Sequence, residues 1–157
     1  MYRAAASAPG SVANLGCLFD AAAAAVAVAR DVVSIKEMDI EEIRVKAVGR
    51  VPEGSENVAY EAARAFLEIV ECSAGVEITV EKGVPIGAGL GSSGATAAAT
   101  VVALNELLGV GASAGELVAA AGEGEALVAG SPHYDNVAAS ILGGIVLVDS
   151  ANPRDRI

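Results

Sequence analysis

A glycine-rich stretch lies in the middle of the chain: Val84-Pro-Ile-Gly-Ala-Gly-Leu-Gly-Ser-Ser-Gly-Ala95. An alanine-rich run without proline follows it up to Pro132 and predicts a helix from about Ser92 to Leu108. Glycines allow positive φ angles and a close approach of the backbone to a ligand. The free N–H groups and the positive dipole end of a helix then attract an anion. The stretch therefore predicts a loop that opens a helix and binds an anion, with phosphate as the obvious candidate.

Two well-known phosphate loops fit this stretch poorly. A P-loop needs Gly-Lys followed by Ser or Thr, and no Lys follows these glycines. A dinucleotide fingerprint should follow a strand directly and precede a second strand that ends in an acidic residue. Here the apolar run Val76–Val80 ends well before Gly87, and residues 110–129 favour a helix. A plain alternative remains open, namely a glycine turn in which Ser92 serves only as the helix N-cap.

Composition narrows the class of protein. The 157 residues indicate one domain, and with 54% hydrophobic but only 3% aromatic residues the core must consist of Ala, Val, Leu and Ile. The formal net charge of −10 argues against binding to nucleic acid or to an anionic membrane. It does not argue against a nucleotide, since backbone amides and a metal ion neutralise phosphates locally.

The two cysteines and the apolar segments indicate a cytoplasmic protein. Cys17 and Cys72 lie far apart without metal-ligand spacing, as expected for free thiols in the cytosol. No signal peptide is evident, and the apolar run 21–29 is too short to span a bilayer.

Hydrophobic periodicity predicts a mixture of strands and helices without strict alternation, which indicates an α+β layer fold. Residues 9–16 are expected to form a turn-rich connection, and residues 20–30 remain ambiguous between helix and strand. The last strand is apolar throughout and is expected to be buried. Strands are expected at 2–8, 43–47, 76–80 and 144–148, and helices at 56–71, 92–108 and 113–129, the last capped by Ser113 with Glu116.

A second polar cluster, Pro132-His-Tyr-Asp-Asn-Val137, follows the helix 113–129 and contains the only histidine of the chain. Such a loop is a usual place for chemistry, and the alternative that Asp135 or Asn136 only caps a short helix near Val137 remains open. Glu123 or Glu125 would supply the hard oxygen that Mg²⁺ prefers, unless both lie on a solvated helix face.

A third cluster, Ser11-Val-Ala-Asn-Leu-Gly16 followed by Phe19-Asp20, places Asn14 and Asp20 in an apolar region. Turn chemistry alone also explains an Asn-x-Gly sequence.

Together the three clusters resemble the GHMP kinases, the superfamily of galacto-, homoserine, mevalonate and phosphomevalonate kinases. Residues 87–93 are similar to its phosphate loop, G-x-G-L-G-S-S. Residues 8–16 with Phe19-Asp20, and the block 133–138 with Gly143-Gly144, are most similar to the homoserine kinase branch. The resemblance extends from Ala8 to about Val148.

The resemblance implies a ribosomal protein S5 domain 2-like fold, with a mixed sheet packed against helices, and transfer of phosphate from ATP to the hydroxyl of L-homoserine. Asn57 would lie near the adenine, Ser93 and Glu125 would hold Mg²⁺, and Asp135 is the candidate catalytic base, or else it orients Asn136 and His133. The ATP phosphates would be bound by Gly87, Gly89, Leu90, Gly91, Ser92, Ser93 and Gly94. The acceptor substrate would contact Asn14, Asp20, His133 and Asn136.

Members of this family are roughly twice as long, so residues 1–157 resemble the N-terminal ATP-binding domain alone. The expected partners are a small-molecule substrate and either a C-terminal domain that is absent from this chain or further copies of the chain. Two alternatives remain: another GHMP kinase that acts on mevalonate, shikimate or a sugar, and a non-catalytic half domain that binds nucleotide.

Overall fold

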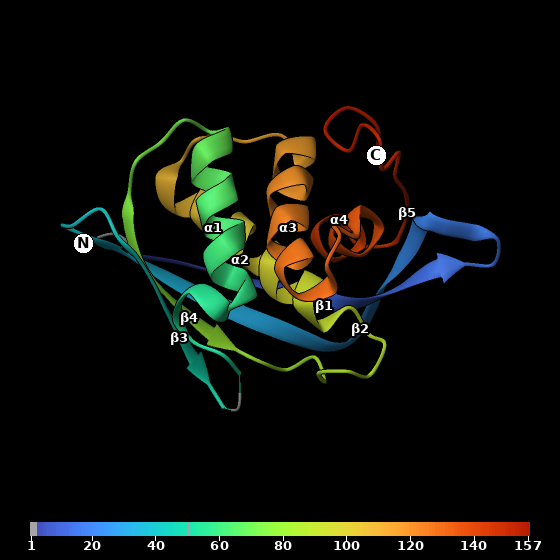
Figure 1. Ribbon diagram of the computed structural model, residues 1–157, viewed down its shortest axis with the longest axis horizontal. Helices are drawn as coiled ribbons and strands as arrows, with labels where there is room; N and C mark the ends of the chain where they lie inside the picture. The colour runs from blue at the N-terminus through green and yellow to red at the C-terminus, as the bar shows by residue number, and fades with distance from the viewer. Residues whose placement is uncertain (1–2, 50) are drawn as a thin grey trace.

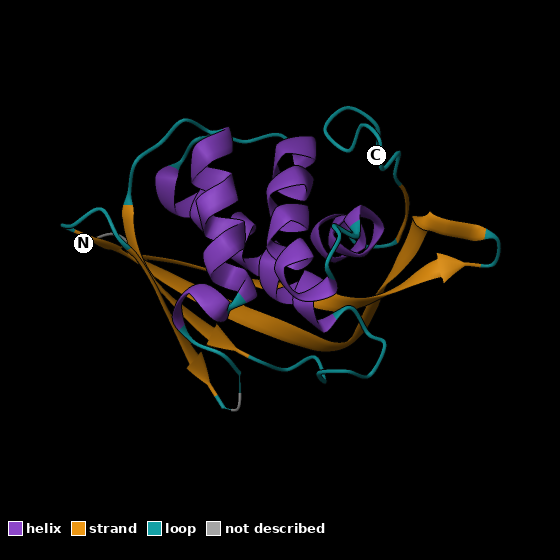
Figure 2. Ribbon diagram, in the orientation of Figure 1, coloured by secondary structure: helices purple, strands orange, loops and turns teal. Residues whose placement is uncertain are grey.

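The computed structural model describes residues 3–49 and 51–157, so Tyr2, expected in the first strand, lies outside the described residues. The helices form one layer and the strands form the other (Figure 2), which confirms the predicted α+β class. The strands are β1 (Arg3–Leu15), β2 (Leu18–Met38), β3 (Ile43–Val48), β4 (Gly75–Glu81) and β5 (Ile145–Leu147). The helices are η1 (Gly54–Glu56), α1 (Val58–Ile69), α2 (Ser92–Leu108), α3 (Ala114–Ala129) and α4 (Tyr134–Leu142).

The long strand β2 organises the mixed sheet, whose order is β1-β2-β4-β3 with β5 paired to β2. Its C-terminal half lies between β1 and β4, and its N-terminal half lies between β1 and β5 (Figure 1). These pairs are antiparallel, whereas β3 and β4 are parallel. The helices α2 and α4 pack directly against β2, whereas α3 packs against the other helices.

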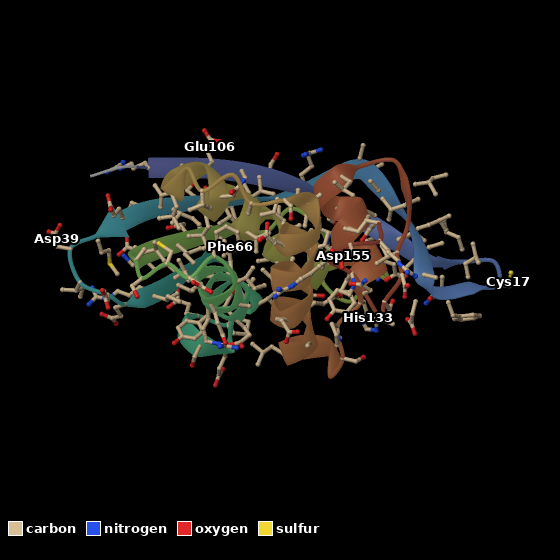
Figure 3. All side chains as sticks on the ribbon, turned by 90° about the horizontal axis from the view of Figure 1, so that it is seen from above. Cys17, Asp39, Phe66, Glu106, His133 and Asp155 are labelled. Atoms are coloured by element: carbon tan, nitrogen blue, oxygen red, sulfur yellow. The ribbon has the colours of Figure 1, made fainter. Side chains whose placement is uncertain are left out.

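The core is aliphatic and built from small residues, as the composition predicts. Phe66 is fully buried in the helix layer (Figure 3), above a sheet face that carries Ile35 and Ile78. Gly124 of α3 lies so close to α1 that an added Cβ would be 2.6 Å from the Cβ of Ala62. Small side chains thus allow the helices to approach closely, but each of them buries less apolar surface than a large side chain would.

The predicted turn at residues 9–16 is wrong, because β1 continues through this segment to Leu15. Pro9 and Gly10 mark a bulge: Pro9 pairs with Arg30 and Gly10 with Val26, so three residues of β2 bulge out between them. Proline and glycine are common at bulges as well as at turns, and the sequence alone does not distinguish the two.

The ambiguous residues 20–30 form part of β2. Their alanines favour a helix intrinsically, but hydrogen bonding to β1 on one side and to β5 on the other overrides that preference. The expectation of a buried last strand is also wrong: Val146 is buried, but Ile145 and Leu147 are 76% and 62% exposed. The outer face of this short strand has no covering layer among the described residues.

The three long helices occur close to where the sequence places them. Ser113 forms the predicted capping box, in which its hydroxyl accepts from the backbone of Glu116 and the Glu116 carboxylate accepts in return. At α2 the N-cap is Gly91 instead of Ser92, so the plain capping alternative for Ser92 is wrong. Within the described chain, no helix combines the length and the apolar character needed to cross a bilayer.

The buried carboxylate of Asp31 on β2 holds the base of the glycine-rich loop. Its Oδ1 accepts hydrogen bonds from the backbone N–H groups of Gly83 and Val84 at 3.0 and 2.9 Å, while Oδ2 accepts from the Thr96 hydroxyl at 2.7 Å. The Lys82 ammonium contacts the same oxygen and also donates to the Ser92 carbonyl and to Thr96. We call Asp31, Lys82 and Thr96 the loop clasp, because they join β4 to the start of α2.

We expect Asp31→Asn to lower the free energy of unfolding by about 3 kcal/mol or more, because it leaves the partly buried Lys82 ammonium without its counter-charge. Denaturant unfolding of the chain measures the change. The matched control is Glu68→Gln, which breaks an exposed pair with Arg64 and should change stability by less than about 0.5 kcal/mol. Similar losses in both variants would contradict the role of the clasp.

Candidate active site

A cleft of about 380 Å³ opens beside the glycine-rich loop. One wall is the loop and the start of α2, and the other is the segment from Val51 to Val58; Ile86 also lines the cleft. The side chain of Lys82 reaches the cleft from the loop clasp. The residues of the predicted phosphate loop that line it are Gly87, Gly89, Leu90, Gly91, Ser92 and Ser93.

The loop has the backbone geometry that its glycines predict. Gly87, Gly89 and Gly91 have φ values of 72°, 69° and 57°, a region that residues with a side chain rarely adopt. Gly91 is the N-cap of α2, so the free N–H groups of the first turn of this 17-residue helix lie next to the cleft. Gly94 is different, since it is buried within α2 and packs against Asn136 and Val137 of α4.

The far wall is fixed by Asn57, which is 5% exposed and lines the cleft. Its Oδ1 accepts from the backbone N–H of Ala59 and so caps α1, and its Nδ2 donates to the carbonyl of Pro52 at 2.7 Å. Both ends of the side-chain amide are thus engaged in holding the wall, and a ligand there would meet the backbone and the apolar Val51 and Pro52.

Glu125 of α3 lies within reach of the loop and of α4. Its Oε1 accepts from the Ser93 hydroxyl at 3.2 Å and lies 3.7 Å from Nδ1 of His133, while its buried Oε2 has no hydrogen-bond partner among the described residues. Burial raises the pKa of Glu125, and the charge of Asp135 adds to this, whereas His133 and the Ser93 hydroxyl act in the opposite direction. Of the two predicted candidates, Glu125 contacts the loop through Ser93, whereas Glu123 lines a separate groove.

Asp135 lies in the first turn of α4, so the alternative that it or Asn136 caps this helix is wrong, because α4 begins at Tyr134 with His133 as N-cap. Its Oδ1 accepts from the backbone N–H of Asn136 at 2.8 Å. Its Oδ2 is buried and lacks a partner in the described chain. Burial raises the pKa of Asp135, and the nearby charge of Asp20 contributes to the increase.

Asn14 and Asp20 belong to the β1–β2 hairpin, which projects from the body of the molecule (Figure 1) with Cys17 at its far end (Figure 3). Both have positive φ without being glycine, and Asn14 Oδ1 accepts from the backbone N–H of Asp20 at 2.9 Å. Strained backbone of this kind is concentrated at functional sites. The Asn14 side chain thus shapes the hairpin next to Asp20, the residue whose charge acts on Asp135.

The glycine-rich loop favours a bound anion, whereas the neighbouring carboxylates repel one. The loop attracts an anion, yet Glu125 contacts it through Ser93 and has a buried, unpartnered oxygen. A divalent cation between them removes the conflict, and a carboxylate oxygen with a hydroxyl is a ligand set that suits Mg²⁺. Among residues 3–49 and 51–157 no group of three or more His, Cys, Asp or Glu converges on one point. The residues present therefore fit a cation that takes its remaining ligands from a bound phosphate and water.

Three contributors to the site escaped the sequence analysis. Asp31 lies on β2 and Lys82 directly follows β4; neither belongs to a motif, although a buried charge within β2 is a weak signal. Ser11 was noted only as part of a cluster, but its backbone N–H donates to the carbonyl of Leu90 at 2.9 Å. It lies on β1 just past the point where residues 27–29 of β2 bulge out, a feature that the sequence does not reveal.

Comparison with known proteins agrees with this geometry. The sequence model of the family described as GHMP kinases N terminal domain matches residues 57–144. The chain is 47% identical to the homoserine kinase of Thermoplasma acidophilum over 143 residues and 42% identical to that of Pyrococcus furiosus over 147 residues. These matches cover 91% and 93% of this chain but 46% and 49% of the relatives.

Solved structures give the same result. The homoserine kinase of Cytophaga hutchinsonii superimposes with a TM-score of 0.88 at 38% identity, covering all of this chain and 51% of the other. The mevalonate kinase of Methanococcus jannaschii has a TM-score of 0.76 at 17% identity, over 92% of this chain and 53% of the other, and so shows the shared fold alone.

The chain spans about half the length of the curated relatives that it matches. The matched range, residues 57–144, nevertheless includes the glycine-rich loop, Glu125 and the block around Asp135. The resemblance expected from the three motifs is confirmed, and the chain belongs to the GHMP kinase family through its N-terminal domain.

Proposed function

We propose that this chain is the ATP-binding domain of a kinase that transfers the γ-phosphoryl group of ATP to the hydroxyl of L-homoserine. One observation carries the proposal: an anion-binding helix N-terminus lies in contact, through Ser93, with the buried and partly unpartnered carboxylate of Glu125. A site of this kind is suited to a phosphate with its metal ion, since neither group is satisfied without the other.

In this proposal the cleft holds the nucleotide. The backbone N–H groups of residues 87–93 surround the phosphates, and the adenine lies against the wall that Asn57 fixes. The loop clasp keeps the loop in place before the ligand arrives, so little conformational entropy is lost on binding. Phosphoryl transfer depends chiefly on such positioning and on charge neutralisation around the γ-phosphate.

Ser93 and Glu125 are the proposed Mg²⁺ ligands. The ion, when bound, neutralises the negative charge that develops on the phosphate oxygens. The Ser93 hydroxyl already lies 3.2 Å from the Glu125 carboxylate, so no large rearrangement of the chain is needed. Glu123 remains outside this arrangement and lies instead in a separate groove with Tyr134 and Arg154.

Asp135 is the proposed base. The oxygen of the acceptor hydroxyl forms a bond to the γ-phosphorus, the bond from that phosphorus to the β–γ bridging oxygen breaks, and ADP leaves. The released proton goes to the unpartnered Oδ2 of Asp135, whose pKa burial raises toward the range in which a base works near neutral pH. Oδ1 meanwhile binds the N–H of Asn136 and so also orients that residue.

Homoserine is the proposed acceptor because the similar proteins from Thermoplasma, Pyrococcus and Cytophaga bear the name homoserine kinase. Asp20 suits the ammonium group of an amino acid, while Asn14, His133 and Asn136 offer polar groups around it. Another acceptor, such as mevalonate or a sugar, is the second candidate, since the M. jannaschii mevalonate kinase shares the fold.

We further propose that residues 1–157 are completed by the half that the relatives have in addition. Phe19, Ile145 and Leu147 are 71%, 76% and 62% exposed, on the hairpin and on the edge strand β5. Exposed apolar residues gathered in this way are typical of an interface. A second copy of the chain is the other candidate to cover them.

The test is release of ADP from Mg·ATP by the chain, with homoserine, mevalonate and shikimate as acceptors. We expect turnover with homoserine only, either by the chain itself or after addition of the separately produced second half of a homoserine kinase. Turnover with mevalonate or shikimate instead would favour the second candidate. An absence of turnover in every mixture would contradict the proposal and favour a non-catalytic nucleotide-binding domain.

We expect Ser93→Ala to weaken binding of Mg·ATP at least tenfold, because it removes a metal ligand. Calorimetric titration of the folded chain measures the affinity. The control is Ser113→Ala, a capping change that should lower stability by about 1 kcal/mol and leave nucleotide affinity unchanged. Equal effects of the two substitutions on affinity would exclude a metal-ligand role for Ser93.

We expect Glu125→Gln to stabilise the chain without ligand by about 1 kcal/mol at pH 7.5 while abolishing Mg²⁺-dependent nucleotide binding. The pKa of Glu125 is raised by burial, so its ionisation costs stability as the pH rises above the ordinary value of 4.5. The gain should therefore disappear below about pH 4.5, where the native and unfolded states are both protonated. Denaturant unfolding at pH 7.5 and pH 4 measures it, and a less stable variant at pH 7.5 would contradict the assignment.

A further inference from the structure

Ser11 connects two parts of the site that are otherwise separate. It lies on β1 just after the bulge and is fully buried. Its backbone N–H donates to the carbonyl of Leu90, in the glycine-rich loop, at 2.9 Å. Its hydroxyl donates to Oδ1 of Asn136, on α4, also at 2.9 Å. The backbone of Ser11 thus contacts the loop proposed to bind the nucleotide, and its side chain contacts Asn136, which is proposed to bind the acceptor.

The contact at Gly91 is equally close. A Cβ at this position would lie 2.3 Å from the Ser11 hydroxyl and 2.9 Å from Oδ1 of Asn136. Gly91 is the N-cap of α2 and follows Leu90 directly, so the backbone here lies beside the Ser11–Asn136 hydrogen bond with no room for a side chain. We expect a shift of this backbone to move Ser11, Asn136 or both.

The hydrogen bond also fixes the orientation of the Asn136 amide. Because Oδ1 accepts from Ser11, the Nδ2 group is directed to the other side, toward Oδ1 of Asp135 at 3.5 Å. That distance is too long for a good hydrogen bond, so Nδ2 keeps a donor free for a ligand. Without the Ser11 hydroxyl, the amide would be free to rotate and present either end.

We propose that Ser11 is a positioning residue that couples the nucleotide loop to Asn136, so that a small displacement of the loop on nucleotide binding is passed on to the amide that faces the acceptor. The inference rests on the proposed function, because it needs a nucleotide in the loop and an acceptor at Asn136. It assigns Ser11 no contact with either ligand. Its whole effect passes through the Leu90–Gly91 peptide and the Asn136 side chain.

A nearby buried hydroxyl, that of Ser140, provides a control that distinguishes loss of coupling from loss of packing. Ser140 of α4 is 4% exposed and its hydroxyl lies 3.4 Å from that of Ser11, but it touches neither Leu90 nor Asn136 through an observed hydrogen bond. Ser140→Ala therefore removes a buried hydroxyl from the same cluster and leaves the Ser11–Asn136 hydrogen bond intact. It is the matched control for Ser11→Ala.

The experiment follows the side-chain amide signals of Asn136 in the ¹⁵N-labelled chain, assigned by their loss in Asn136→Asp, during titration with Mg·AMP-PNP. We expect these signals to shift as the nucleotide saturates the unaltered chain and the Ser140→Ala variant. In Ser11→Ala we expect nucleotide affinity within about threefold of the unaltered chain but less than a third of the Asn136 shift.

The outcomes distinguish the two proposals. If the unaltered chain does not bind Mg·AMP-PNP, the proposed function fails and the coupling fails with it. If the nucleotide binds but the Asn136 signals do not move, or move equally in Ser11→Ala, the coupling alone is overturned. The unaltered chain thus tests the inference even if Ser11→Ala does not fold.

Discussion

The buried carboxylate of Asp31 holds the rest of the site in place. It accepts hydrogen bonds from the backbone where the glycine-rich loop leaves β4, and from Thr96 where α2 has begun, with Lys82 as its counter-charge. A loop of glycines has little intrinsic preference for one conformation. Anchoring both of its ends to one carboxylate on the longest strand gives such a loop a defined shape without side chains of its own.

The remaining polar groups of the site are joined to this loop by a series of hydrogen bonds. Ser11 reaches Leu90 from β1, Ser93 reaches Glu125 on α3, and Asn136 of α4 lies on Ser11. The result is a site in which the N-terminus of α2 adjoins carboxylates whose burial raises their pKa. We expect such an arrangement to cost stability in the free chain, and in the proposed function a bound cation and phosphate compensate for it, as is common where function and stability compete.

The sequence predicted what depends on local patterns. The bounds of α2, the capping box of α3 and the motif residues of the loop follow from periodicity, capping chemistry and glycine content. It failed where tertiary contacts decide: Pro9 and Gly10 lie in a strand opposite a bulge of β2 instead of in a turn, and Ile145 lies on an exposed face. It left the alanines after Asp20 undecided between helix and strand, and they join β2. Asp31 and Lys82 have no local signature, since they meet only once β2, β4 and α2 have assembled. Glu125 was distinguished from Glu123 by resemblance, because helical periodicity alone does not separate the two.

The central claim is that the loop and Glu125 bind one ligand together, a nucleotide phosphate with its metal ion. The most direct measurement is calorimetric titration of the chain with AMP-PNP in the presence of Mg²⁺ and again with EDTA. The account predicts binding with Mg²⁺ and at least tenfold weaker binding without it, since the Glu125 carboxylate then repels the phosphates. Equal affinity under both conditions, or no binding under either, would contradict it.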